Sequence, residues 1–141
     1  MRKFNKLALL LIAGYLLLLG YWMLFGFGRT PHKEYMYNLK PFSTISHFLQ
    51  TDNFNTKTWV INLLGNIGVF IPFGILLPMI IRRGFIIVSI LFFLGLFILE
   101  SIQLVSKRGS FDVDDFILNY IGFLIGYWII KITVNTTSDK L

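Results

Sequence analysis

Residues 99–126 read LESIQLVSKRGSFDVDDFILNYIGFLIG, and this stretch decides how the rest of the chain can be arranged. Three aspartates, a glutamate, an arginine, a glutamine and an asparagine lie here, between two of the most apolar runs in the sequence. Ionisable groups within or against a bilayer are costly, so each of them needs a partner or a function. We therefore expect the activity of the protein to depend on this stretch.

The composition indicates a membrane protein. The chain has 141 residues, of which 55% are hydrophobic and only 14% are charged, whereas a soluble domain carries about 25% charged residues. The apolar residues gather in four runs, at 7–27, 59–81, 85–105 and 116–134. Each run is close to the ~20 residues that a helix needs to cross the hydrocarbon core. The sequence therefore predicts an all-α fold, an integral membrane bundle of four transmembrane helices that forms a single domain over residues 1–141.

The longest connection, at 28–58, separates the first two apolar runs. Within it, residues 39–49 are expected to form a short helix that lies at the membrane interface. Unstructured connections of this length are uncommon and often functional. We therefore expect this segment to contribute to a site.

The basic residues set the expected orientation. The net charge is +6, but the lysines and arginines are scattered over the short flanks of the apolar runs. That distribution favours contact with membrane lipids over nucleic-acid binding. Arg2, Lys3 and Lys6 precede the first run, and Arg82 and Arg83 lie between the second and third. By the positive-inside rule, both termini are predicted to be cytoplasmic.

The sequence lacks a signal-peptide cleavage site after the first run, and it lacks cysteine. No small-x-small cleavage site follows the first run, so we expect it to be retained as a span rather than removed as a signal peptide. The chain has no cysteine, which excludes a disulfide framework and a thiol nucleophile.

Polar side chains of three predicted helices fall at similar depth beneath the outer loop at 106–114. Their spacing of three or four residues places each pair on one helix face. The pairs are Asn62 and Asn66, Glu100 and Gln103, and Asp115 and Asn119. The amides could instead be interhelical hydrogen-bonding groups. A carboxyl group as deep as that of Glu100 is expected to be either protonated or ion-paired, and Arg108 is its expected partner.

The segment 112–115, Asp-Val-Asp-Asp, is the second concentration of acidic groups. Capping of the helix that begins near Asp115 accounts for at least one of these three acids. Binding of a divalent cation by Asp112, Asp114 and Asp115 is left open because hard cations take carboxylate oxygens, although the spacing matches no established loop motif. No other cofactor is evident from the sequence.

Several motifs, taken in order, resemble those of the VanZ-like family. They are Asn38-Leu-x-Pro41-Phe42, Asn62-x-x-Gly-Asn66, Phe70-x-Pro72-Phe73-Gly74-x-x-x-Pro78, Glu100-x-x-Gln103, Arg108, and Phe111-Asp112-x-Asp114-Asp115-x-x-x-Asn119-x-x-Gly122-x-x-x-Gly126. The resemblance covers about two-thirds of the chain. It implies a small bacterial cell-membrane protein, common in Gram-positive organisms. The namesake of the family is an accessory factor in resistance to the glycopeptide antibiotic teicoplanin.

Three functions remain open on these residues. The first is an envelope factor that binds a cell-wall precursor, a lipid headgroup or a glycopeptide through an outward-facing polar pocket. The second is an enzyme acting on a lipid-linked substrate, with Glu100 or Asp115 as general base. The third is a small transporter with Glu100 as its ion-binding acid. The candidate ligand-binding residues are Asn62, Asn66, Glu100, Gln103, Arg108, Asp112, Asp115 and Asn119.

Gly122 and Gly126 form a Gly-x-x-x-Gly pair in the last apolar run. Such a pair allows close approach of helices, either within the bundle or between protomers. The sequence therefore leaves open a homo-oligomer formed through these glycines.

Overall fold

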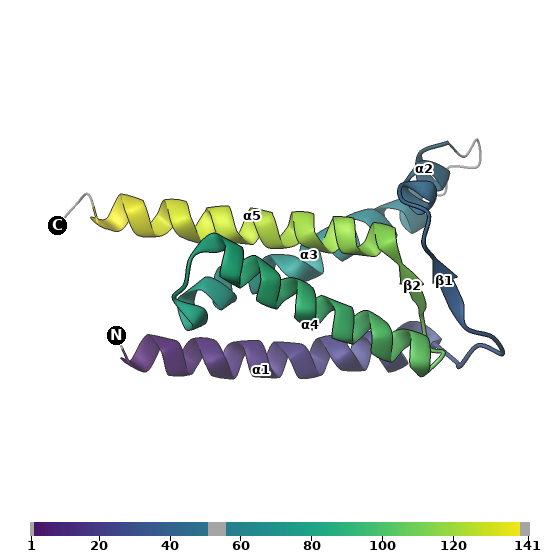
Figure 1. Cartoon of the computed structure of the whole chain (residues 1–141), viewed down its shortest axis with the longest axis horizontal. Coiled ribbons are helices and arrows are strands. Elements are labelled where there is room, and N and C mark those ends of the chain that lie inside the picture. The colour runs from purple at the N-terminus through teal and green to yellow at the C-terminus, as the bar shows by residue number, and fades with distance from the viewer. Residues whose placement is uncertain (1, 51–55, 139–141) are drawn as a thin grey trace.

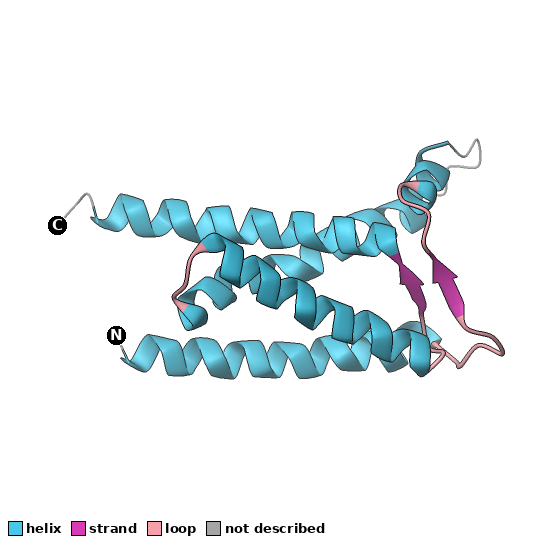
Figure 2. Cartoon of the chain, viewed as in Figure 1, coloured by secondary structure: helices cyan, strands magenta, loops and turns pink. Residues whose placement is uncertain are grey.

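The computed structural model describes the backbone over residues 2–50 and 56–138, and the side chains over 6–26, 28–47 and 63–134. Four long helices lie side by side, and a cap of short elements closes one end of the bundle (Figures 1 and 2). The elements are α1 (Arg2–Phe25), a 3-10 turn η1 (Gly26–Gly28), β1 (Met36–Asn38), α2 (Ser43–Gln50), α3 (Thr56–Ile81), α4 (Phe85–Val105), β2 (Ser110–Asp112) and α5 (Val113–Ser138).

The four predicted spans are confirmed. Within the described residues, four helices are long and apolar enough to cross a membrane: Lys6–Phe25, Leu63–Ile81, Phe85–Val105 and Val113–Val134. Large apolar side chains on their outer faces are left uncovered; Leu10 and Leu17 of α1, for example, are 72% and 78% exposed. In a bilayer these surfaces face lipid, where their exposure has no cost.

The core of the bundle is aromatic. Phe92 of α4 stacks on Phe123 of α5 with ring centroids 4.5 Å apart, and Phe70 of α3 meets Phe92 edge-on at 5.9 Å. α1 joins this core through the Tyr15 hydroxyl, which donates a hydrogen bond to the carbonyl oxygen of Val69 at 2.7 Å. These contacts hold all four helices around one centre.

Glycines let α3 and α5 pack backbone against backbone. A Cβ atom on Gly122 would collide with the carbonyl oxygen of Ile67, and one on Gly126 with that of Ile71. The Gly-x-x-x-Gly pair is therefore used within the bundle, the first of the two alternatives that the sequence allowed. Because α3 already covers both glycines, a homo-oligomer would have to use another surface of the chain.

The cap was only partly foreseen. The short helix between the first two spans is present, but it begins at Ser43 rather than residue 39, after a turn in which Phe42 has a positive φ of 61°. β1 and β2 pair in parallel, with Tyr37 opposite Phe111. No strand was predicted, because three-residue strands are too short to carry an alternating pattern.

Candidate functional site

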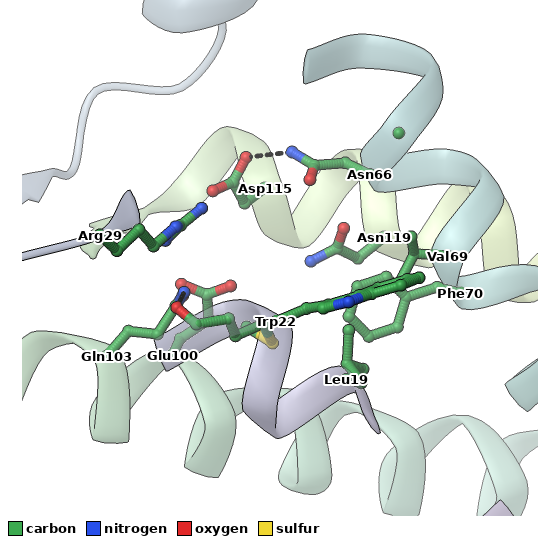
Figure 3. Close-up of a pocket in the computed structure, with 12 residues that line it drawn as sticks. Leu19, Trp22, Arg29, Asn66, Val69, Phe70, Glu100, Gln103, Asp115 and Asn119 are labelled. Atoms are coloured by element: carbon green, nitrogen blue, oxygen red, sulfur yellow. Dashed lines mark hydrogen bonds between the residues drawn. The ribbon is translucent and has the colours of Figure 1, made fainter. Parts of the chain in front are cut away.

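A pocket of about 450 Å³ lies between the helices at the capped end of the bundle (Figure 3). All four long helices contribute to its wall, and so does Arg29, which directly follows η1. The lining residues are Leu19, Trp22, Met23, Arg29, Gly65, Asn66, Val69, Phe70, Glu100, Gln103, Asp115 and Asn119. The volume falls within the range of about 300–1,000 Å³ that is typical of small-molecule sites.

Glu100 is the most unusual residue in the wall. It lies in the last two turns of α4 and is only 2% exposed. Its Oε2 atom is buried and has no hydrogen-bond partner among the described residues. A buried carboxylate oxygen without a partner is expensive. Figure 3 shows the carboxyl group directed into the pocket, which is where a partner could be supplied.

α5 and α3 contribute the facing polar groups. Asn66 donates a hydrogen bond from Nδ2 to Oδ1 of Asp115 at 2.6 Å. One turn further along α5, Asn119 is 2% exposed, and its Oδ1 atom also has no partner among the described residues. The close packing of α3 on α5 places these groups together on one side of the cavity, across from Glu100 (Figure 3).

Gln103 joins the pocket to the end of α1. Its Nε2 atom donates a hydrogen bond to the carbonyl oxygen of Met23 at 3.2 Å. That carbonyl lies in the last turn of α1, where helix carbonyls lack partners within their own helix. Gly109 packs against the same amide, because a Cβ atom there would lie 2.9 Å from Nε2 of Gln103. Gln103 is therefore fixed by its surroundings on both sides.

The prediction of an ion pair between Glu100 and Arg108 is wrong. Arg108 instead donates from Nη1 to the carbonyl oxygens of Leu24 and Arg29, both at 3.3 Å, and lies 4.7 Å from the ring centroid of Phe25. It is not among the residues that line the pocket.

The end of α4 explains this direction. The amide of Arg108 donates to the carbonyl of Gln103, and the amide of Lys107 donates to that of Leu104. This is the Schellman pattern of helix termination. Lys107 has a φ of 56° in the position where glycine is usual, and the resulting turn directs Arg108 toward the end of α1.

Arg29 is the site cation that the sequence interpretation missed. It directly follows η1, lines the pocket and extends toward Asp115 and Glu100 (Figure 3). One signal was available: Arg29 stands just beyond the end of the first span, at the end of the bundle where Glu100 was placed. Its Nη1 atom donates to the carbonyl oxygen of Arg108 at 3.3 Å, which completes a reciprocal pair between the two arginines.

Asp112 and Asp114 lie in the cap and outside the pocket. Asp112 caps α5: its Oδ1 atom accepts the amide of Asp114 at 2.9 Å, as expected of an N-cap. Its Oδ2 atom accepts the hydroxyl of Thr44 at 2.6 Å, and Asn38 donates to both oxygens at 3.3 and 3.4 Å. The capping role foreseen for at least one of the three acids is therefore confirmed for Asp112.

Asp114 is completely buried and holds the start of α2. Its carboxylate accepts the backbone amides of Phe42, Thr44 and Ile45. These include amides at the start of α2 that have no partner within that helix. The residue thus fastens the connection between the first two spans to the start of α5.

The proposed cluster of three acidic metal ligands does not form. Asp112 and Asp114 bind the cap, whereas Asp115 faces Asn66 in the pocket. Within the described part of the chain, no three His, Cys, Asp or Glu residues lie close enough together to hold a metal ion.

Of the eight candidate binding residues, the structure brings five into one pocket. These are Asn66, Glu100, Gln103, Asp115 and Asn119. Arg108 and Asp112 lie elsewhere: the first bonds to the end of α1 and the second to the cap. The side chain of Asn62 falls outside the described residues.

The fold and the pocket define a small multi-pass helical membrane protein with a polar cavity near one end of its bundle. The family model described as VanZ/LLP1 matches residues 9–134. The chain therefore belongs to the VanZ/LLP1 family. Searches of curated proteins and of solved structures found no match.

Proposed function

We propose that the protein binds the polar part of a membrane-anchored molecule in this pocket. One observation carries the proposal: two almost completely buried acceptors, on Glu100 and Asn119, line a cavity of about 450 Å³ without a hydrogen-bond partner among the described residues. Buried polar groups in proteins are nearly always paired. A ligand that donates hydrogen bonds would remove this deficit.

The other wall of the pocket suits a molecule that resides in the bilayer. Leu19, Val69 and Phe70 supply apolar surface next to the polar groups. Trp22 also lines the pocket and is 43% exposed. An amphiphile could therefore place its headgroup among the polar residues and its tail along α1.

We propose that the pocket opens on the outer face of a bacterial cell membrane. The N-terminus and the turn between α3 and α4 lie at the opposite end of the bundle from the cap (Figure 1). Basic residues at that opposite end, including Arg82 and Arg83, favour a cytoplasmic location for it. Because the chain has no native cysteine, single cysteines replacing Lys33 and Gly84 test this. Labelling by an impermeant maleimide in intact cells should occur at position 33 alone.

The resemblance to teicoplanin-resistance factors suggests a ligand class. A lipid-linked cell-wall precursor, a lipid headgroup or the lipoglycopeptide itself would each have a polar part for the pocket and an apolar part for the membrane. Raised teicoplanin tolerance in Gram-positive cells that express the wild type, lost on Glu100→Gln, would support the resistance role. Full tolerance with a correctly inserted Glu100→Gln variant would count against it.

The direct test is capture of the ligand. Wild type and Glu100→Gln are purified from membranes, and the lipids and precursors that co-purify are identified by mass spectrometry. Glu34→Gln is the matched control because Glu34 is an exposed residue of the cap segment and does not line the pocket. We expect one class of molecule to be retained by wild type and Glu34→Gln and depleted from Glu100→Gln. Equal retention by all three proteins would contradict the proposal.

A membrane enzyme is the second candidate, because two carboxyl groups, on Glu100 and Asp115, line the same pocket. Either could act as general base toward a bound lipid-linked substrate. Turnover of labelled precursor by the purified protein would support this function. Sensitivity of that turnover to EDTA would show whether a divalent cation takes part.

A further inference from the structure

Two buried polar atoms of the pocket residues lack a hydrogen-bond partner among the described residues, and both are oxygens. Asn66 and Gln103 each have an amide nitrogen that could donate, but the first is bonded to Asp115 and the second to the carbonyl of Met23. The two buried oxygens without a partner are Oε2 of Glu100 and Oδ1 of Asn119. The polar floor of the pocket therefore needs a ligand that brings hydrogen-bond donors.

The charges of the wall indicate what kind of donor fits. Glu100 and Asp115 contribute two carboxyl groups, and Arg29 contributes one guanidinium. A neutral, hydroxyl-rich headgroup would satisfy the acceptors but would bring no positive charge to two carboxyl groups whose ionised forms are costly in a buried site. A primary ammonium supplies three donors and a positive charge together. It can also lie over an aromatic ring, and Trp22 lines the same pocket.

Arg29 indicates that the ligand also carries an anionic group. Its guanidinium has five donor hydrogens, and the one hydrogen bond found for it within the described residues is the 3.3 Å contact to the Arg108 carbonyl. The neighbouring cations are differently placed: Arg108 bonds to Leu24 and Arg29, and Lys107 bonds to the carbonyl of Lys33. Arg29 is therefore the cation in the wall that can meet an anionic group, and it favours a phosphate because of its planar array of donors.

We propose that the pocket selects amphiphiles whose headgroup carries a primary ammonium beside an anionic group, as in phosphoethanolamine, with the ammonium against Glu100 and Asn119 and the anion against Arg29. The inference rests on the proposed function and specifies its ligand class. The apolar surface of Leu19 and Phe70 takes the start of the tail. Next to it, the Cα of Gly65 has open space where a Cβ atom would stand.

A headgroup series tests this on the full-length protein in detergent. Native mass spectrometry measures binding of phosphatidylethanolamine, its N,N-dimethyl derivative, phosphatidylcholine and phosphatidylglycerol, all with the same acyl chains. The series removes the N–H donors stepwise while keeping the phosphate and the tails. Phosphatidylglycerol replaces the ammonium with hydroxyl groups.

We expect phosphatidylethanolamine to bind at least about tenfold more tightly than phosphatidylcholine or phosphatidylglycerol, since charged hydrogen bonds are lost in both. The affinity of the dimethyl lipid should fall between those of phosphatidylethanolamine and phosphatidylcholine. Glu100→Gln should abolish the preference, while Glu34→Gln should retain it. Soluble phosphoethanolamine should compete only weakly, because it lacks the tail.

Equal binding of the ethanolamine and choline lipids by the wild type would overturn the ammonium assignment, whether or not any variant folds. Preference for phosphatidylglycerol that depends on Glu100 would also overturn it, while leaving the binding function of the pocket intact. If soluble phosphoethanolamine competes as well as the lipid, the inference that the ligand is an amphiphile bound partly through its tail would be refuted. If no lipid binds in a manner that depends on Glu100, the ammonium inference fails, and ligand capture from membranes then decides the proposed function separately.

Discussion

Replacement of Gly122 by alanine should force α3 and α5 apart. A Cβ atom at this position would collide with the backbone carbonyl oxygen of Ile67, which cannot rotate away as a side chain could. Carbon and oxygen atoms in close contact lie about 3.3–3.6 Å apart, so the helices must separate by on the order of 1 Å. Overpacking of this kind costs about 1–3 kcal/mol. The higher helix propensity of alanine offsets up to about 1 kcal/mol of this cost.

Since Gly68→Ala has the same gain in propensity, Gly122→Ala is expected to be less stable than Gly68→Ala by about 1–3 kcal/mol, or roughly 3–12 °C in melting temperature. The assay is thermal unfolding of the purified protein in detergent, followed by tryptophan fluorescence. Gly68→Ala is the matched control because it lies on the same helix pair and its Cβ atom would meet nothing within 4 Å. If Gly122→Ala proved as stable as Gly68→Ala, the close packing of α3 on α5 would be refuted.

Three further predictions concern the cap, the turn that ends α4 and the two arginines. Asp114→Asn should speed hydrogen exchange at the amides of Phe42, Thr44 and Ile45 by at least about tenfold, because the carboxylate that accepts all three is lost; unchanged protection would contradict the clamp. Lys107→Gly should be more stable than Lys107→Ala by up to about 1 kcal/mol in denaturant titration, because both lose the bond to the Lys33 carbonyl and glycine alone relieves the positive φ; equal stability of the two variants would argue against that strain. Arg108→Gln should lower the melting temperature without changing the retained ligand, whereas Arg29→Gln should reduce ligand retention. Loss of ligand retention in Arg108→Gln but not in Arg29→Gln would refute the assignment of a structural role to Arg108 and a binding role to Arg29.

The sequence is sufficient to predict the spans and most of the convergence of polar residues. Helical spacing fixes which side chains share a face, and alternate crossing of the membrane fixes which helix ends meet. These two rules alone bring together Asn66, Glu100, Gln103, Asp115 and Asn119. They depend on local pattern and on the direction of each span, which is why they are reliable here.

What the sequence could not supply depends on long-range contacts. In 112–115, the chain passes from a strand into a helix, so Asp112 and Asp114 bond to the cap while Asp115 turns into the pocket. Spacing alone made the three acids look like one cluster. Likewise, the turn at Lys107 directs Arg108 toward α1 and leaves Arg29 beside the carboxyl groups. Neither outcome follows from spacing, because the first depends on contacts between residues 38–45 and the start of α5, and the second depends on how the end of α1 meets the loop after α4.

Photocrosslinking in living cells tests the central claim, that the pocket holds a membrane amphiphile, most directly. The photoreactive residue p-benzoylphenylalanine replaces Trp22, which lines the pocket, or Trp128, which lies 52% exposed on α5. Adducts formed on irradiation are identified by mass spectrometry. We expect position 22 to capture one class of amphiphile that is enriched there over position 128 and whose enrichment is lost when Glu100→Gln is added. Adducts at position 22 that match the bulk lipid captured at position 128, with or without Glu100, would contradict the account.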